Sequence, residues 1–158
     1  MTWPKEKLLA NIMVLVFRLN GRLLEQGDRL VEGLNLTSAR WQVLGALALA
    51  GRPLTAPQIA GAMGITRQGA QKQLNLLMDE GLLDRHPNPS HERSPLYVLT
   101  GAGGRAFAEA NRLCDLWAAD LGQVLPEDAL RTTETVLGEL LVRLNRPLPI
   151  HSPAEEAS

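Results

Sequence analysis

Two short helices with well-defined ends, separated by a three-residue turn, constrain the fold of this chain more than any other feature. Thr55 and Gln58 form a capping box, in which the Thr hydroxyl and the Gln side chain satisfy backbone N–H groups at the start of a helix over residues 56–63. The capping box therefore fixes the start of the first helix. The turn over residues 64–66, which follows this helix, begins with glycine.

The second helix, predicted over residues 67–80, is bounded as firmly as the first. Thr66 is its N-cap, and Gly81 is suited to the left-handed conformation that stops a helix. Leu82 is then placed to touch Leu77, the apolar contact that accompanies this kind of stop.

A β-hairpin with a long tip is predicted after the second helix. Residues 82–83 and 96–99 are short apolar runs typical of strands, and the loop over residues 87–95 is polar and rich in proline. Helix, tight turn, helix and hairpin in this order form a winged helix-turn-helix. In that arrangement the first helix braces the second, which fits the major groove of DNA.

The second helix has an apolar face and a polar face. Its apolar residues recur at helical spacing and are expected to pack on the first helix. They are Ala70, Leu74 and Leu77, opposite Ile59, Ala60 and Met63. The other face carries residue types that read base edges or bind phosphate at a helix N-terminus: Thr66, Arg67, Gln68, Gln71, Lys72 and Asn75. No acidic residue precedes Asp79 on this helix, which favours DNA contact over a solvated surface.

The hairpin tip carries Arg93 beside Ser94, with His91 nearby. An arginine at a wing tip can enter the minor groove, whose negative potential is strongest where the groove is narrow. The alternative is an ion pair with Glu92 or a solvated loop charge. We predict that Arg93 and Ser94 contact DNA.

Long helices flank this segment, and the first of them has more apolar surface than one narrow stripe. We expect them over residues 5–32 and 36–50, with Gly33 ending the first, and over residues 101–121 and 125–145. Another surface must cover them, so we predict a homodimer built from the N- and C-terminal helices.

The predicted fold is mainly α, of the α+β class, with about six helices and one β-hairpin wing. Its parts are an N-terminal dimerisation helix (1–35), a winged helix-turn-helix DNA-binding domain (36–100), C-terminal dimerisation helices (101–146) and a mobile tail (147–158). The tail has too little apolar surface to bury.

Composition favours a cytoplasmic protein without a membrane span. The longest apolar run near the N-terminus, residues 12–17, is far shorter than the roughly 18 residues that a span requires. The start of the chain lacks the small-residue cleavage site of a secretory signal, and the single Cys114 excludes an intramolecular disulfide. Residues 1–105 hold 12 Lys and Arg against 8 Asp and Glu, whereas residues 106–158 hold 4 against 9. One part of the chain is therefore suited to face phosphates.

Several runs resemble the MarR family of bacterial regulators. They are LTSARWQVL at 36–44, LT at 54–55, QIA at 58–60, ITRQ at 65–68, GLLDR at 81–85, RS at 93–94 and LTGAG at 99–103. The resemblance implies a dimer with interlocking terminal helices, two winged lobes, and repression that a small ligand or oxidation relieves.

The resemblance also implies roles for individual positions. Arg67, Gln68, Gln71 and Lys72 match the recognition helix, and Arg93 matches the wing arginine. The family usually has an aspartate two residues before that arginine, where this chain has His91. An effector pocket is implied where the first two long helices meet the DNA-reading lobe, with these candidate lining residues, for which plain core packing is the alternative: Met13, Phe17 and Trp41.

Other classes of protein fit the sequence less well. His86, His91, Glu92 and Asp84 lie close together in the chain, but they have no standard metal spacing and no partnered nucleophile, so we predict neither an enzyme nor a cofactor. Cys114 lies among apolar helical residues, which favours core packing over redox sensing.

The expected function is a DNA-binding transcriptional regulator, a repressor that binds a pseudo-palindromic operator as a homodimer and is released by a small-molecule effector. The alternative is a winged-helix module for protein contacts without specific DNA binding. Salt separates the two, because counterion release makes DNA binding fall steeply with salt.

Overall fold

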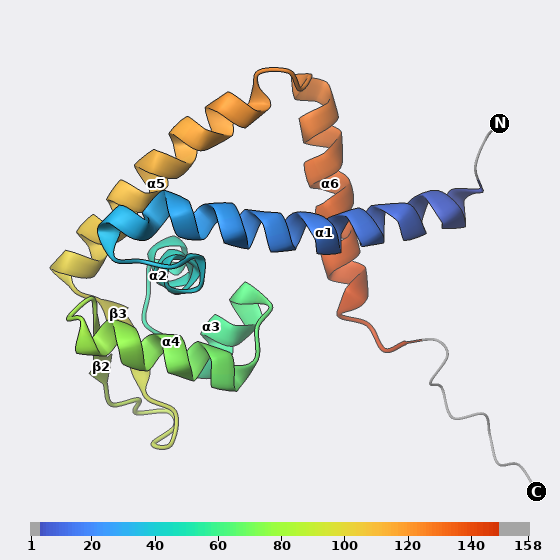
Figure 1. Ribbon diagram of the computed structural model, residues 1–158. Helices are drawn as coiled ribbons and strands as arrows, with labels where there is room; N and C mark the ends of the chain where they lie inside the picture. Colours follow the sequence, from blue (N-terminus) through green and yellow to red (C-terminus); the bar gives the residue numbers. More distant parts are fainter. Residues whose placement is uncertain (1–3, 149–158) are drawn as a thin grey trace, which may run out of the picture. The chain divides into compact units, whose positions relative to one another are not determined.

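The computed structural model describes residues 4–148 (Figure 1). The elements in chain order are α1 Lys5–Val31, the 3-10 helix η1 Glu32–Leu34, α2 Ser38–Ala50, β1 Leu54–Thr55, α3 Ala56–Met63, α4 Arg67–Asp79, β2 Leu83–His86, β3 Leu96–Leu99, α5 Gly101–Gly122 and α6 Glu127–Leu144. The chain divides into two compact units, one up to Leu116 and one from Trp117. In the part of the chain that the structure describes, no helix is both long and apolar enough to cross a membrane.

The predicted helix–turn–helix is confirmed together with its caps. The Thr55 hydroxyl accepts from the Gln58 N–H at 3.4 Å, and the Gln58 side chain accepts from the Thr55 N–H at 2.9 Å. The Thr66 hydroxyl accepts from the Gly69 N–H at 3.0 Å. Gly64 ends α3 in the left-handed conformation, with φ 65°. Because all of these contacts are local, the sequence specifies them directly.

The end of α4 also forms as predicted. Gly81 has φ 72°, its N–H donates to the Met78 carbonyl at 2.9 Å, and the Leu82 N–H donates to the Leu77 carbonyl at 2.9 Å. This pair of bonds is the Schellman motif, which satisfies carbonyls that have no partner within the helix.

A short strand, β1, joins the hairpin as a third strand that sequence analysis did not predict. The strand order is β1-β3-β2 with both pairings antiparallel, and Leu54 and Arg85 lie opposite Tyr97 from either side. Two residues are too few to show an alternating pattern, so β1 depends on its partner strand. The predicted strand at residues 82–83 begins one residue later than expected and extends to His86.

The core of the first unit lies between α2, α3, α4 and the sheet. Ala70, Leu74 and Leu77 are fully buried, as predicted for the inner face of α4. Ile59 and Ala60 of α3 are buried as well. The largest fully buried side chains are Tyr97, Leu44, Ile59, Leu74, Leu77, Leu83, Val31 and Val43.

The junction between α1 and α2 corrects one prediction. Gly33 does not end the first helix in a special conformation, because α1 stops at Val31 and Gly33 lies inside η1. Asn35 takes the left-handed conformation instead, with φ 56°. Asparagine tolerates that region better than most residues, because its short polar side chain can form local hydrogen bonds.

Close contacts fix α1 against the start of α2. The Ser38 hydroxyl donates to the Leu24 carbonyl at 2.9 Å, and the Ser38 N–H donates to the Asp28 carboxylate at 2.7 Å. Gly27 leaves the room for this approach, since a Cβ there would lie 2.4 Å from the Ser38 hydroxyl oxygen.

The second unit contains the end of α5 and the whole of α6. Helix α6 carries exposed apolar side chains, namely Leu130, Val136, Leu141, Val142 and Leu144. Most of the predicted mobile tail, residues 149–158, lies outside the described residues. The predicted division of the chain at residues 35, 100 and 146 stays a prediction.

Candidate nucleic-acid interface

The polar side chains predicted to read DNA lie along the outer surface of α4. Arg67, Gln68, Lys72 and Asn75 are exposed, and Gln71 is half-buried. Among the described residues, neither Arg67 nor Lys72 forms an ion pair. Two cations on this helix therefore remain available to an external anion.

The wing tip is held by a residue that sequence analysis missed. The Asn88 side chain accepts from the Ser90 N–H at 3.1 Å and donates to the Ser94 carbonyl at 2.9 Å. The Asn88 and His91 carbonyls close two further turns by accepting from the N–H groups of His91 and Ser94. Asparagine commonly organises turns through its own side chain, and the Asn88–Pro89 pair was the available signal. The tip is thus ordered without an aspartate at position 91.

Helix α4 and the wing tip meet in one hollow. Arg67 at the start of α4 and Arg93 at the wing tip both line a depression of about 470 Å³, together with Thr55, Pro57, Asn88, His91 and Ser94. No carboxylate lines this depression. The fold therefore brings together two predicted contact residues that are 26 positions apart in the chain, in surroundings suited to a phosphate group.

The centre of α4 contains a hydrogen-bond network between the helix and the sheet. The Gln71 amide nitrogen donates to the Asn75 side-chain oxygen at 2.9 Å and to the Tyr97 hydroxyl at 3.1 Å. Tyr97 belongs to β3 and is 1% exposed. Sequence analysis predicted Gln71 and Asn75 at this surface but not Tyr97, because the tyrosine reaches α4 only through tertiary packing.

The three predicted effector-pocket residues do not lie together. Met13 and Phe17 are exposed on α1, with 45% and 76% of their surface accessible. Trp41 is half-buried on α2 and packs near Gly27. Since α1 rises about 1.5 Å per residue, Phe17 lies roughly 15 Å along the helix from Gly27. The predicted role of these residues in ligand binding stays a prediction.

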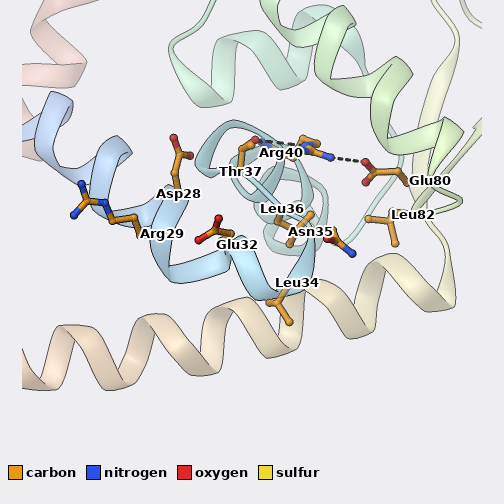
Figure 2. Close-up of a pocket in the computed structure, with 10 residues that line it drawn as sticks. All are labelled: Asp28, Arg29, Glu32, Leu34, Asn35, Leu36, Thr37, Arg40, Glu80 and Leu82. Atoms are coloured by element: carbon orange, nitrogen blue, oxygen red, sulfur yellow. Dashed lines mark hydrogen bonds and ion pairs between the residues drawn. The ribbon is translucent and has the colours of Figure 1, made fainter.

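A cavity larger than the hollow beside Arg67 and Arg93 lies elsewhere in the first unit, at the ends of α1 and α4 and the start of α2. It has a volume of about 900 Å³. Figure 2 shows the Arg40 side chain directed at Glu80, with which it forms an ion pair across this cavity. Leu36 and Leu82 add apolar surface. A molecule bound here would contact both α2 and the C-terminal end of α4.

The sequence cluster of histidine and carboxylate residues near the wing forms no metal centre. Within residues 4–148, no group of three or more His, Cys, Asp or Glu side chains is arranged to hold a metal ion. Cys114 is partly buried on α5. Burial raises the pKa of the Cys114 thiol, and the negative charge of Asp115 raises it further.

The shape of the surface suits a double helix. The outer face of α4 is exposed, the major groove is wide enough to admit an α-helix, and a hairpin beside it can reach the adjacent minor groove. With unpaired cations on both parts, the surface can bind phosphates, and its amide side chains can contact base edges.

Comparison with known proteins agrees with this geometry. The sequence model that describes the MarR family matches residues 34–94 of this chain. An uncharacterized protein of Mycobacterium tuberculosis is 34% identical over 141 residues, which cover 89% of this chain and 97% of that relative.

Two solved structures are similar over most of their length. A MarR family transcriptional regulator from Silicibacter pomeroyi is 25% identical, with a TM-score of 0.77 over 90% of this chain and 95% of that one. A mutant MarR from E. coli, complexed with operator DNA, is 24% identical, with a TM-score of 0.68 over 83% of this chain and 96% of that one.

Proposed function

This chain belongs to the MarR family, and from that premise we propose that it regulates transcription by binding double-stranded DNA through α4 and the wing. One observation carries the proposal: Arg67 and Arg93, which are exposed and form no ion pair among the described residues, line the same carboxylate-free hollow. The similar fold of E. coli MarR in complex with operator DNA supports the same use of this surface.

The proposed roles differ along the surface. Arg67, Gln68, Gln71 and Asn75 contact base edges in the major groove, while Lys72 and the N-terminal end of α4 at Thr66 bind phosphate. Arg93, supported by Ser94, enters the minor groove.

We propose that the active form is a homodimer. Nine large apolar side chains of α1 have between 37% and 76% of their surface exposed, and they are Leu8, Leu9, Met13, Val14, Leu15, Val16, Phe17, Leu19 and Leu23. A stable monomer rarely leaves so much apolar surface in water. A two-fold dimer would place two α4 helices in successive major grooves, roughly 34 Å apart, on a pseudo-palindromic operator.

The test of DNA recognition begins with fragments that the protein selects from genomic DNA of its own organism. Arg67→Ala is expected to weaken binding to a selected fragment by about 1–3 kcal/mol and to relax the preference at one base position. Arg22→Ala is the matched control, because Arg22 is exposed and pairs only with Glu25 on its own helix. Unchanged affinity for Arg67→Ala would remove α4 from the interface.

We further propose that DNA binding represses transcription and that a small molecule relieves repression by occupying the 900 Å³ cavity at Arg40 and Glu80. The cavity joins α2 to the end of α4, so an occupant that separates this ion pair would reorient α4. Compounds that release a selected fragment provide the test. Arg40→Gln is expected to abolish the response to such a compound, whereas a response lost only in Phe17→Ala or Trp41→Ala would place the site at the residues predicted from the sequence.

A further inference from the structure

The Gln71 side chain is committed to two partners before any DNA is bound. Its amide nitrogen has two hydrogens, and the Asn75 side-chain oxygen and the Tyr97 hydroxyl accept both of them, at 2.9 and 3.1 Å. No described residue donates to the Gln71 side-chain oxygen. Gln71 therefore offers an approaching base an acceptor and no donor.

The same network leaves Asn75 with a free donor instead of a free acceptor. Its oxygen accepts from Gln71, whereas its amide nitrogen has no partner among the described residues. Four residues along a helix correspond to about 6 Å of rise, close to two base-pair steps. The outer face of α4 thus carries an acceptor at Gln71 followed, one turn later, by a donor at Asn75.

Tyr97 can hold this arrangement firmly because it is not a surface residue. It is 1% exposed, and its strand is paired on both sides, with Leu54 in β1 and Arg85 in β2. Its hydroxyl is consequently a fixed point to which Gln71 is anchored, while Gln71 itself is half-buried.

We propose that Tyr97 is a positioning residue that determines which base Gln71 selects. The inference depends on the proposed docking of α4 in the major groove. A free glutamine pairs with adenine through one donor and one acceptor, but a glutamine restricted to its acceptor recognises only an amino group. Both adenine and cytosine present an amino group in the major groove, whereas guanine and thymine present acceptors. Gln71 therefore selects an amino base and does not distinguish adenine from cytosine.

The experiment measures base preference in fragments that carry each of the four bases at one position. That position is identified as the one whose preference disappears in Gln71→Ala. For the natural protein we expect adenine and cytosine to be bound about equally and both to be preferred over guanine and thymine. A bidentate contact would give a preference for adenine over cytosine of about fivefold or more. Such a preference in the natural protein would contradict the proposal.

Tyr97→Phe removes the hydroxyl and keeps the buried ring. One Gln71 N–H is then free to complete a bidentate contact, so adenine is expected to become preferred over cytosine by about fivefold or more. Gln71→Glu is the matched comparison, because glutamate has acceptors and no donor. In that background Tyr97→Phe is expected to leave the ratio of adenine to cytosine unchanged. A shift of the same size in both backgrounds would show that Tyr97 acts through packing.

A measurement without DNA tests the hydrogen bonds themselves. In the free protein the Gln71 side-chain amide protons are expected to exchange with solvent slowly, and faster in Tyr97→Phe. Equal exchange in the two proteins would refute the anchoring. If the natural protein shows no preference at any base position, the proposed function fails. If it is sequence-selective but Tyr97→Phe leaves the ratio of adenine to cytosine unchanged, only the role of Tyr97 fails.

Discussion

Among the described glycines, Gly103 has the least room for a side chain. A Cβ at this position would lie 2.0 Å from the Leu82 carbonyl oxygen, a backbone atom that no side-chain rotation can move. The neighbouring Thr100 hydroxyl donates to the Gly81 carbonyl at 2.7 Å and accepts from the Gly103 N–H at 3.0 Å. The start of α5 is therefore tied directly to the end of α4.

We expect Gly103→Ala to lower the free energy of unfolding by about 1–3 kcal/mol, because the backbone must separate to admit one methyl group. Gly104→Ala is the control, since a Cβ there meets nothing within 4 Å. Because alanine has a higher helix propensity than glycine, the control is expected to be up to about 1 kcal/mol more stable than the natural protein. Urea unfolding at one fixed protein concentration measures both, and equal stability of the two variants would refute the close approach.

Cys114 is expected to react slowly with thiol reagents at neutral pH. The thiolate is the nucleophile, and burial together with Asp115 raises the pKa of this thiol, so the protonated form dominates at pH 7 and the rate rises only at more alkaline pH than for an ordinary cysteine. The rate of thiol modification against pH checks this, with the urea-unfolded chain as the reference. A folded-state rate at pH 7 above the unfolded rate would instead indicate an activated, sensor-like cysteine.

Single residues were predictable where their role depends on near neighbours in the chain. The caps at Thr55 and Thr66 follow from residue type at the helix ends, and the polar face of α4 follows from helical periodicity. The network from Gln71 to Tyr97 spans 26 positions in the chain. It depends on the strand register that brings Tyr97 under α4, which no local pattern indicates.

In the wing, the Asn88 side chain adds two hydrogen bonds to the two backbone turns of the tip. Asn88→Ala removes the bonds to the Ser90 N–H and the Ser94 carbonyl. The loop is exposed, so we expect the free energy of unfolding to change by less than about 0.5 kcal/mol. Binding to a selected DNA fragment is expected to weaken, because Arg93 must then be ordered when DNA binds.

Two comparisons make the wing experiment specific. Ser90→Ala keeps the backbone N–H that donates to the Asn88 side chain, so this variant is expected to bind the selected DNA fragment like the natural protein. Replacing Arg93 with alanine should cost less in the Asn88→Ala background than alone, since residues that act together are not additive. Additive losses would show that Asn88 does not position Arg93.

The helices were predictable as elements because each contains apolar residues at helical spacing and is bounded by a cap or a breaker. The strand β1 and the end of α1 were not. Leu54–Thr55 becomes a strand only because β3 lies beside it. Helix α1 stops before Gly33 because Asn35 provides the left-handed residue after η1. In both places, tertiary contacts or a second suitable residue outweighed the local signal.

The proposed homodimer concerns the whole molecule and is tested through the exposed apolar side chains of α1. Phe17→Glu places a charge where 76% of an aromatic side chain is exposed on α1, and it is expected to shift the protein towards monomer. Leu49→Glu is the control, because Leu49 is 85% exposed on α2, outside the terminal helices. Sedimentation over a range of concentrations distinguishes these outcomes. A natural protein that stays monomeric at every concentration would exclude the homodimer.

A single titration tests whether the protein binds DNA sequence-selectively. A fragment selected from the genome and a scrambled fragment of the same composition are titrated with the natural protein over a series of salt concentrations. We expect the selected fragment to bind roughly 10³-fold more tightly or better. Both affinities are expected to fall as salt rises, because bound phosphates release counterions. Equal affinity for the two fragments at every salt concentration would contradict sequence-selective binding.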